Sequence, residues 1–294
     1  MPMMFSDVSR RGSEQSKISR RKFFGRTVGL TVAALLADQV VCDKDDLIIT
    51  KSDVRLARWP HEASGVTVGV LSDFHADYDH AVHRVARAAL LLANRKPDIA
   101  IVAGDYISSH LTRHFLAPTV NALSPLTTAP GGAYAIMGNH DCWGNNHDLA
   151  TKLLDRAGFT VLNNRSVPFP GVPEAYIVGL DDAWCHRMNV QKALRDVPVD
   201  AVKIVALHEP DFADVIGSGF DLQISGHSHG GQIRIPGLPV LHAPAYGRKY
   251  PEGLQKAEHH LVYTTRGIGM IGPQIRTFCP PEVTLLTLKS GAVA

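Results

Sequence analysis

The sequence lacks a long apolar segment, a clear charge excess and a cysteine framework. No uncharged apolar run in its 294 residues approaches the roughly 20 that span a bilayer, which excludes a multi-span membrane protein. The formal charge is only +2, whereas a dedicated nucleic-acid-binding protein usually carries a marked basic excess. The four cysteines show no CxxC spacing and are too sparse for a disulfide scaffold. Apolar residues at 45% and charged residues at 20% are typical of a folded globular chain.

The positive charge is concentrated at the N-terminus. Residues 1–27 hold seven basic and two acidic side chains, and the apolar run 28–37 follows, ended by Asp38. A basic stretch before a short apolar run is the layout of an export signal. The segment 19–24 (SRRKFF) resembles the twin-arginine signal, which directs folded proteins across the bacterial inner membrane. The alternative is a solvated basic tail before a buried helix.

We therefore expect residues 1–45 to be a leader recognised by the twin-arginine export machinery. Leu35, two residues before Ala37, makes a poor cleavage site, so both cleavage elsewhere and retention as a tether stay open. The expected location is the periplasm, free or peripherally tethered to the bacterial inner membrane. Folded export suits a metalloprotein that must acquire its ion before it leaves the cytoplasm.

Beyond the leader, short β-branched runs alternate with segments of helical period. Runs typical of strands occupy 66–71, 99–103, 133–137, 175–180, 202–207, 222–225, 261–265 and 283–288. Apolar residues at helical spacing predict helices around 81–92 and 149–154. No repeat and no low-complexity tract occurs. The alternation predicts a layered α/β fold with one or two mixed sheets, in a single domain over 60–294.

Five of the predicted strands run directly into small polar clusters. These clusters are Asp73-Phe74-His75, Gly104-Asp105, Gly138-Asn139-His140-Asp141, His208 and Gly226-His227-Ser228-His229-Gly230-Gly231. Loops beyond strand ends are where sites assemble in α/β sheets, because rigid strands hold the loop side chains against one another. Any one cluster alone is explained by turn chemistry. Five in succession, each at a strand end, predict a common site.

The residue types in these clusters indicate divalent metal. The candidate ligands are Asp73, His75, Asp105, Asn139, His208, His227 and His229. A mixed Asp/His/Asn set suits Mn, Fe, Zn or Co rather than an all-oxygen Ca or Mg cage. Seven ligands are too many for one tetrahedral ion but suit two, which Asp105 can bridge. Two metals about 3.5–4 Å apart clamp the attacking hydroxide and a phosphoryl oxygen of an in-line displacement.

The series of clusters resembles the calcineurin-like metallophosphoesterase superfamily over roughly residues 64–290. The resemblance implies a four-layer sandwich in which two mixed β-sheets pack together and are flanked by helices. It assigns the first ion to Asp73, His75, Asp105 and His229, and the second to Asp105, Asn139, His208 and His227. It also implies that His140 binds no metal, but sits over the phosphate, stabilises the transition state and helps to protonate the leaving oxygen.

One departure from the family pattern concerns the partner of His140. Protein-phosphatase members carry a second Asp three residues after the bridging one, followed by Arg-Gly, whereas this chain has Ser108-Ser109-His110 there. The His–Asp dyad that would polarise His140 is therefore missing, which argues against a phosphoprotein substrate. We expect Asp141 to orient His140 instead, as a second catalytic residue.

Within the superfamily, the chain looks most like a bacterial branch of exported or membrane-associated phosphodiesterases. The resemblance rests on the segments 179–184, 226–232, 246–250 and 265–269. It implies a phosphodiester or pyrophosphate substrate, with lipid and envelope compounds among the candidates. Arg248, Lys249 and Arg266 are expected to contact the anion, the alternative being solvated surface charge. Trp184 either walls the pocket or packs in the core.

Three functions are compatible with the sequence. The main hypothesis is a phosphodiester or pyrophosphate hydrolase that uses two divalent metal ions. The second is a UDP-2,3-diacylglucosamine pyrophosphatase of lipid A synthesis, which some relatives of the branch are. The third is an exported metal-binding module without turnover, against which His140 argues because a binder needs no such histidine.

Overall fold

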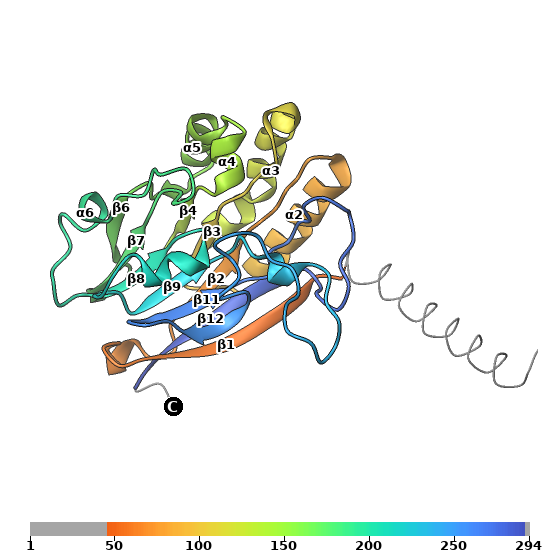
Figure 1. Cartoon of the computed structure of the whole chain (residues 1–294). Coiled ribbons are helices and arrows are strands. Elements are labelled where there is room, and N and C mark those ends of the chain that lie inside the picture. Colours follow the sequence, from red (N-terminus) through yellow and green to blue (C-terminus); the bar gives the residue numbers. More distant parts are fainter. Residues whose placement is uncertain (1–45, 292–294) are drawn as a thin grey trace, which may run out of the picture. The chain divides into compact units, whose positions relative to one another are not determined.

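Two six-stranded mixed sheets lie at the centre of the computed structural model, which describes residues 46–291 (Figure 1). The expected leader, residues 1–45, lies outside the described residues. The first sheet consists of β1 (Ile48–Leu56), β2 (Thr67–Leu71), β3 (Ile99–Ala103), β4 (Ala133–Ile136), β5 (Thr160–Val161) and β12 (Glu282–Ser290). The second consists of β6 (Arg165–Phe169), β7 (Val172–Gly179), β8 (Val202–Ala206), β9 (Leu222–Ser225), β10 (Gly253–Lys256) and β11 (Leu261–Thr264).

The strand order is β1-β12-β2-β3-β4-β5 in the first sheet and β10-β11-β9-β8-β7-β6 in the second. Strands β2 to β5 are parallel, as are β7, β8, β9 and β11. Antiparallel pairs join β12 to β2, β10 to β11 and β6 to β7. The parallel strands therefore bring their carboxyl ends to one edge of each sheet, where loop side chains from different strands can meet.

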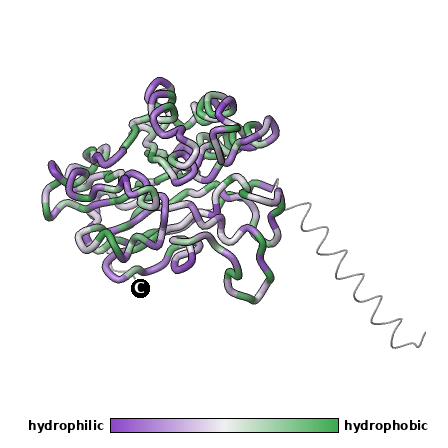
Figure 2. Tube along the Cα trace, turned by 45° about the horizontal axis from the view of Figure 1, so that its top comes forward, coloured by the Kyte–Doolittle hydropathy of each residue, from purple (hydrophilic) through white to green (hydrophobic). Residues whose placement is uncertain are grey.

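Helices are concentrated on the outer face of the first sheet. The α-helices are α2 (Asp79–Ala93), α3 (Leu116–Ala122), α4 (Asn139–Trp143), α5 (His147–Arg156) and α6 (Val190–Ala193). Short 3₁₀ segments are η1 (His61–Ala63), η2 (His110–Phe115), η3 (Ser124–Thr128), η4 (Pro210–Asp214) and η5 (His229–Gly231). Within the described residues no helix has the length and apolar character needed to cross a membrane. Hydrophobic and hydrophilic stretches alternate along the trace, as expected when each element buries one face (Figure 2).

Two large apolar clusters hold the layers together. Between the sheets, Val70 and Ile101 of the first sheet share a buried cluster with Ile204 of the second. On the outer face, Leu92 of α2 and Leu154 of α5 pack into a cluster with side chains of the first sheet. Because strand side chains alternate between faces, each central strand contributes to both layers. The predicted sandwich of two mixed sheets flanked by helices is confirmed.

The structure also contains strands that the hydrophobic pattern did not indicate. Strand β1 lies before residue 60, where the sequence analysis placed the start of the folded domain, and it pairs in parallel with β12 over nine residues. Its charged positions Lys51, Asp53 and Arg55 face solvent, so it lacks the apolar run of a buried strand. Strands β6 and β10 are the edge strands of the second sheet, and most of their residues are likewise not buried.

Candidate metal centre

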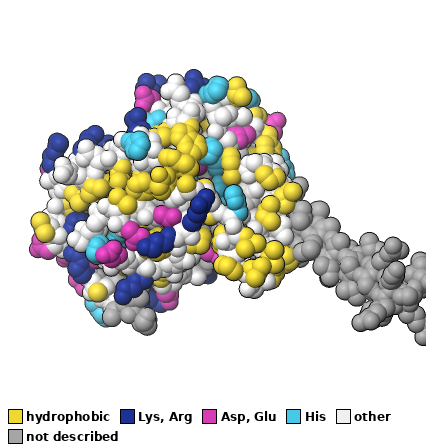
Figure 3. Space-filling view, viewed as in Figure 1, with side chains coloured by type: hydrophobic (Ala, Val, Ile, Leu, Met, Phe, Trp, Pro, Cys, Tyr) yellow, Lys and Arg dark blue, Asp and Glu magenta, His cyan; other side chains and the backbone are white. Residues whose placement is uncertain are grey.

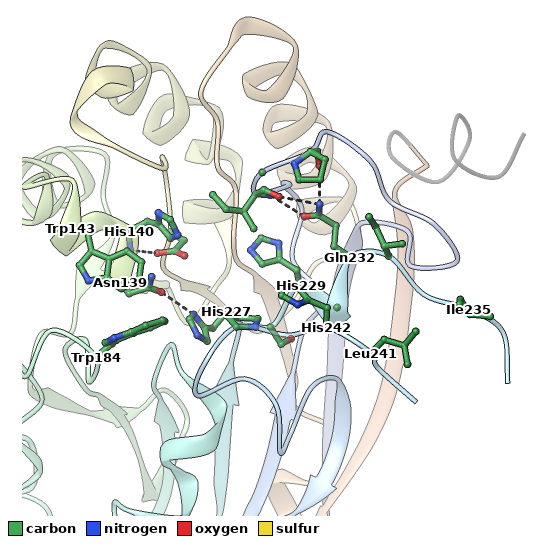
Figure 4. A pocket seen from close by; sticks show the side chains of 18 residues that line it. Asn139, His140, Trp143, Trp184, His227, His229, Gln232, Ile235, Leu241 and His242 are labelled. Atoms are coloured by element: carbon green, nitrogen blue, oxygen red, sulfur yellow. Dashed lines mark hydrogen bonds between the residues drawn. The ribbon is translucent and has the colours of Figure 1, made fainter. Parts of the chain in front are cut away.

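The five predicted clusters meet where the carboxyl ends of β2, β3, β4, β8 and β9 converge. Asp73 and His75 follow β2, Asp105 follows β3, and Asn139 with His140 begins α4 after β4. His208 follows β8, while His227 and His229 follow β9. All seven candidate ligands are buried, and Figure 4 shows several of them around one cavity. The structure thus brings together every predicted ligand, from both sheets.

The backbone at these positions is unusual. Five of the seven candidate ligands, none of them glycine, have a positive φ: Asp73, His75, Asp105, His227 and His229, at 53°, 41°, 60°, 71° and 53°. The left-handed region is sparsely populated by residues with a Cβ, and such strain concentrates at functional sites where the surrounding structure enforces it. The tight turns after the strands aim these side chains at one another.

Ligand atoms fall into two groups that Asp105 connects. In the first, Asp73, His75 and His229 place ligand atoms within 4.8 Å of one another, with Asp73 Oδ1 3.5 Å from His229 Nε2. In the second, Asp105, His208 and His227 do the same. Asp105 Oδ2 lies 3.1 Å from His208 Nε2 and 3.5 Å from His75 Nε2, so one carboxylate faces both groups.

Hydrogen bonds on the far side of the rings fix which nitrogen faces the centre. His208 Nδ1 donates to the carbonyl of Ala103 at 2.6 Å, and His227 Nε2 donates to that of Ala245 at 2.8 Å. A carbonyl only accepts, so these nitrogens carry hydrogen. The remaining nitrogens, His208 Nε2 and His227 Nδ1, then point inward, as is usual for metal-binding imidazoles.

Several inward atoms lack a well-matched hydrogen-bond partner. His227 Nδ1 faces Asn139 Oδ1 at 2.9 Å, and a neutral ring that already donates through Nε2 places two acceptors against each other there. Within the described part of the chain, His75 Nε2 is buried and without a hydrogen-bond partner, while His208 Nε2 has only the Asp105 carboxylate nearby, at 3.1 Å. An unpaired buried polar atom costs about 1–3 kcal/mol. A cation among these atoms removes both the facing acceptors and part of that cost.

The protonation states also suit a metal. Burial lowers the pKa of His75 to about 3 and that of His227 to about 4, so both rings are neutral ligands at pH 7. Burial raises the pKa of Asp73 to about 6. For His208, burial lowers the pKa, but the Asp105 carboxylate outweighs burial and raises it well above the usual range. In the metal-free protein, the positive charge of protonated His208 thus balances the negative charge of Asp105. A bound metal ion would supply that positive charge instead.

His140 lies beside the centre and is held by backbone contacts. Its Nδ1 donates to the carbonyl of Ser108 at 2.9 Å, and its own N–H donates to Asp105 Oδ1 at 2.9 Å. Its ring meets that of His75 edge-on, with centroids 4.9 Å apart. It is only partly buried, whereas the candidate ligands are buried, and it lines the cavity together with four of them. The Ser108 carbonyl therefore takes the place of the missing dyad carboxylate.

Asp141 has a different role from the expected one. Its buried carboxylate accepts the backbone N–H groups of Gly138, Asp105 and Tyr106 at 2.9, 2.9 and 3.1 Å. Burial raises its pKa to about 7. The expectation that it orients the His140 ring needs correction, because the ring bonds to Ser108. Asp141 instead ties the loop after β3 to the start of α4, and so positions Asp105 and His140 together.

The centre opens into a cavity of about 660 Å³. Asp105, Asn139, His140, His227 and His229 line its polar side. Trp184 is part of the wall rather than of the core, and its ring meets those of Trp143 and His227 edge-on, with centroids 4.6 and 5.5 Å apart. The wall continues along Ile233, Ile235, Leu241, Pro244, Ile271 and Pro273.

The three predicted anion contacts lie elsewhere. Arg266 pairs with the buried Glu282 at 2.9 Å, and the exposed Lys249 pairs with Asp214 at 2.6 Å. Arg248 donates to the carbonyl of Ala243 at 3.2 Å. Among the described residues that line the cavity, none of the three cations occurs. The ion-pair partners of Arg266 and Lys249, Glu282 and Asp214, are distant in the sequence, so the sequence pattern did not reveal them.

Comparison with known proteins agrees with this geometry. The family model for calcineurin-like phosphoesterases matches residues 66–231, which include every candidate ligand and His140. The chain belongs to the calcineurin-like phosphoesterase family. A phosphoesterase of this family hydrolyses phosphate esters, and the family together with the residue groups above suggests divalent metal as the cofactor.

Relatives extend over nearly the whole chain. An uncharacterised metallophosphoesterase of Bacillus subtilis, YkuE, is 29% identical, with 93% of this chain and 99% of that protein covered. Phosphodiesterase YaeI of Escherichia coli is 31% identical, with 80% and 86% covered. A more distant relative, the UDP-2,3-diacylglucosamine pyrophosphatase LpxG of Chlamydia muridarum, is 24% identical, with 90% and 97% covered.

Proposed function

We propose that the chain is a dinuclear-metal phosphodiesterase or pyrophosphatase. The observation that supports it most directly is the pair of buried ligand groups that share Asp105. His75 Nε2 lacks a hydrogen-bond partner in the first group, and His227 Nδ1 faces the amide oxygen of Asn139 in the second. Asp73, His75, Asp105 and His229 would hold one ion. Asp105, Asn139, His208 and His227 would hold the other. Mn, Fe, Zn and Co all accept these donors.

The chain's own residues prepare the reaction. When bound, such a metal pair supplies an activated water for in-line attack and neutralises the phosphoryl oxygens. His140 keeps its hydrogen on Nδ1 because that atom is bound to the Ser108 carbonyl. Its Nε2 is then the atom that carries a proton to the leaving oxygen. Asp141 holds the backbone that presents Asp105 and His140 to the same phosphate.

Metal analysis joined to three variants tests this proposal. Asp105→Asn and His208→Ala should each lower the bound metal and the hydrolysis of bis-4-nitrophenyl phosphate by at least about a hundredfold. His140→Ala should keep the metal and lose about 10²- to 10⁴-fold in kcat, because it removes only a proton donor. Unchanged hydrolysis by Asp105→Asn or His208→Ala would refute the proposal.

Two other functions make different predictions. A UDP-2,3-diacylglucosamine pyrophosphatase is favoured by the relative that carries this activity and by the apolar cavity wall. It requires access to a cytoplasmic nucleotide substrate, so a catalytic domain found solely in the periplasm counts against it. A non-catalytic exported metal-binding module would bind metal fully yet fail to turn over any member of a broad phosphoester panel that covers lipids, nucleotides and wall phosphodiesters.

For location, we propose export by the twin-arginine route, to the periplasm or to a peripheral position on the bacterial inner membrane. The basis is the sequence of residues 19–24 and the apolar run after it, both outside the described residues. Replacement of both Arg20 and Arg21 by Lys should retain the folded protein in the cytoplasm. Unaltered export of that variant, measured by cell fractionation, would contradict the proposal.

A further inference from the structure

The cavity at the metal centre is polar at its middle and apolar at both ends. Figure 4 shows Trp143 and Trp184 on one side of the histidines, and Ile235 and Leu241 on the other. All four side chains line the same cavity as His227 and His229. Inorganic phosphate or a sugar phosphate would leave these apolar walls in contact with water. A ligand that fills the cavity must therefore join a phosphoester to apolar groups.

The aliphatic end is unusually exposed. Ile233, Ile235 and Leu241 are 45%, 51% and 60% exposed, and all three line the same cavity, so they form one exposed apolar surface rather than scattered residues. Figure 3 shows hydrophobic side chains gathered over the loop that follows η5. Contiguous exposed apolar surface next to a catalytic cavity is typical of a ligand-binding groove.

Hydrogen bonds between loops hold this end of the cavity in shape before any ligand binds. Gln232 Nε2 donates to the carbonyls of Ile271 and Pro273 at 3.1 and 2.9 Å, and its Oε1 accepts the N–H of Ile271 at 3.0 Å. The amide thus joins the loop that carries Ile233 and Ile235 to the one that carries Ile271. The fully buried Arg276 donates to backbone carbonyls, including those of Gly269 and Arg266 at 2.7 and 2.8 Å.

We propose that this aliphatic wall holds a hydrocarbon chain esterified to the phosphate, so that the substrates are amphiphilic phosphodiesters or pyrophosphates. The inference rests on the proposed function, because it assigns the substrate class of the same site. Its occupant is the acyl or alkyl chain of a lipid phosphoester rather than a protein partner. The wall and the metal ligands belong to one cavity, so one molecule that fills the cavity contacts both.

The two ends are assigned to different substituents. His140 meets Trp143 edge-on with ring centroids 5.1 Å apart, so the proton donor lies at the aromatic end. The leaving group that accepts this proton therefore belongs beside Trp143 and Trp184. The hydrocarbon substituent that stays on phosphorus belongs beside Ile235 and Leu241. Hydrolysis then breaks the bond from phosphorus to the leaving oxygen, with water supplying the new oxygen and His140 the proton.

A homologous substrate series measures the contribution of the chain. Methyl, butyl and octyl 4-nitrophenyl phosphate share one leaving group and one reaction, and all are used below their micelle concentrations. With the metal-loaded protein, kcat/KM should rise about two- to fourfold per methylene, since each methylene leaves water for the wall. The rise in kcat/KM should be seen with the octyl ester dissolved as monomers, in the absence of micelles or any other lipid–water interface.

Variants place the effect in the cavity. Ile235→Ser and Leu241→Ser should flatten the series, because they should lower kcat/KM for the octyl ester much more than for the methyl ester. Leu238→Ser is the matched control, since Leu238 is 48% exposed on the same loop but does not line the cavity. It should keep the chain-length dependence of the wild type.

Calorimetry gives a readout that does not depend on turnover. Octylphosphonate should bind the metal-loaded protein at least tenfold more tightly than methylphosphonate, with a more negative heat-capacity change that marks apolar burial. Leu241→Ser should reduce this preference and Leu238→Ser should not. Failure to hydrolyse the methyl ester and every member of the phosphoester panel would refute the proposed function, while the calorimetry still tests the wall.

Two results would overturn the inference while leaving the proposed function standing. One is hydrolysis of all three esters with equal kcat/KM, together with equal binding of the two phosphonates. The other is a loss of chain-length dependence in Leu238→Ser as large as in Leu241→Ser. In that case the whole loop, as a membrane-contacting surface, and not the cavity wall, would recognise the chain.

Discussion

The imidazole of His140 is bound by the backbone of Ser108, whose carbonyl accepts the Nδ1 hydrogen at 2.9 Å. The hydroxyl of the same serine lies 2.8 Å from Nδ1 of His75, a candidate metal ligand. One residue thus orients both the proton donor and a metal-facing ring, through two different atoms. Replacing the side chain removes the second contact and spares the first.

Ser108→Ala should therefore separate metal binding from proton transfer. We expect the affinity for metal to fall about 10- to 100-fold, as for other lost partners of ligating histidines. At saturating metal, kcat and its pH profile should stay within about threefold of wild type, because the carbonyl that holds His140 remains. Metal titration followed by steady-state kinetics checks both statements. A large fall in kcat at full metal occupancy would show that the hydroxyl acts in the reaction.

Metal binding should weaken in mild acid, because Asp73 must ionise to become a ligand. Burial raises its pKa to about 6 in the metal-free folded protein, against an ordinary value of 3.8. The metal must displace the His208 proton and, below pH 6, the Asp73 proton as well, so affinity should fall more steeply with decreasing pH below 6 than above it. The increase in Tm on adding metal should accordingly be large at pH 7.5 and small at pH 5.

In the metal-free protein, the raised pKa of Asp73 has the opposite effect on stability: it favours the fold at low pH rather than at high pH. A carboxyl whose pKa is raised on folding stabilises the fold fully below pH 3.8, and this contribution is lost as the pH rises through 6. Metal-free Asp73→Asn should therefore gain stability over wild type above pH 6 and lose that gain below pH 4. An Asp73→Asn variant less stable than wild type at pH 8 without metal would contradict this account.

Gly138→Ala should disrupt the metal centre because the added methyl group would collide with Asp105. A Cβ at position 138 would overlap Asp105 Oδ1 and approach its backbone nitrogen to 2.9 Å. Asp105 is held by several contacts and cannot move without disturbing both ligand groups. We expect at least a hundredfold loss of activity with reduced metal content. Gly171→Ala is the control, since a Cβ there meets nothing within 4 Å, although its φ of 74° carries a small backbone cost.

The strand-end pattern predicted the centre because the ligands are tied to the sheets. Each of Asp73, Asp105 and His208 lies within two residues of a buried strand, so position in the sequence determines position at the sheet edge. The same argument places His227 and His229 after β9. Asn139 and His140 begin α4 within four residues of the end of β4. Their position was predictable for the same reason.

The features that were not predictable depend on long-range loop packing. The Ser108 carbonyl carries no side-chain signal, and the backbone of any residue could take its role. Asp141 was expected at the His140 ring, but three backbone N–H groups from two loops bind it more fully. The aliphatic wall comes from Ile235, Leu241 and the distant Ile271, which are apolar residues in loops without period. Trp143, three residues after His140, offered the one local signal, since that spacing places both on one helix face.

Arg266→Ala and Lys249→Ala should distinguish structural charge from substrate contact. Lys249 is an exposed partner of Asp214, and exposed ion pairs contribute little to stability, so its loss should change neither stability nor KM measurably. Arg266 pairs with Glu282, whose side chain is only 3% exposed, and removing the cation leaves a buried carboxylate that keeps bonds from Tyr263 and Thr284. We expect Arg266→Ala to lower the free energy of unfolding by about 3 kcal/mol while KM for the methyl ester stays within twofold. Adding Glu282→Gln to Arg266→Ala should restore part of this stability, because no buried charge then remains. Denaturant unfolding and steady-state kinetics on the same preparations distinguish the two roles. A tenfold rise in KM for Arg266→Ala without loss of stability would show that Arg266 contacts the substrate.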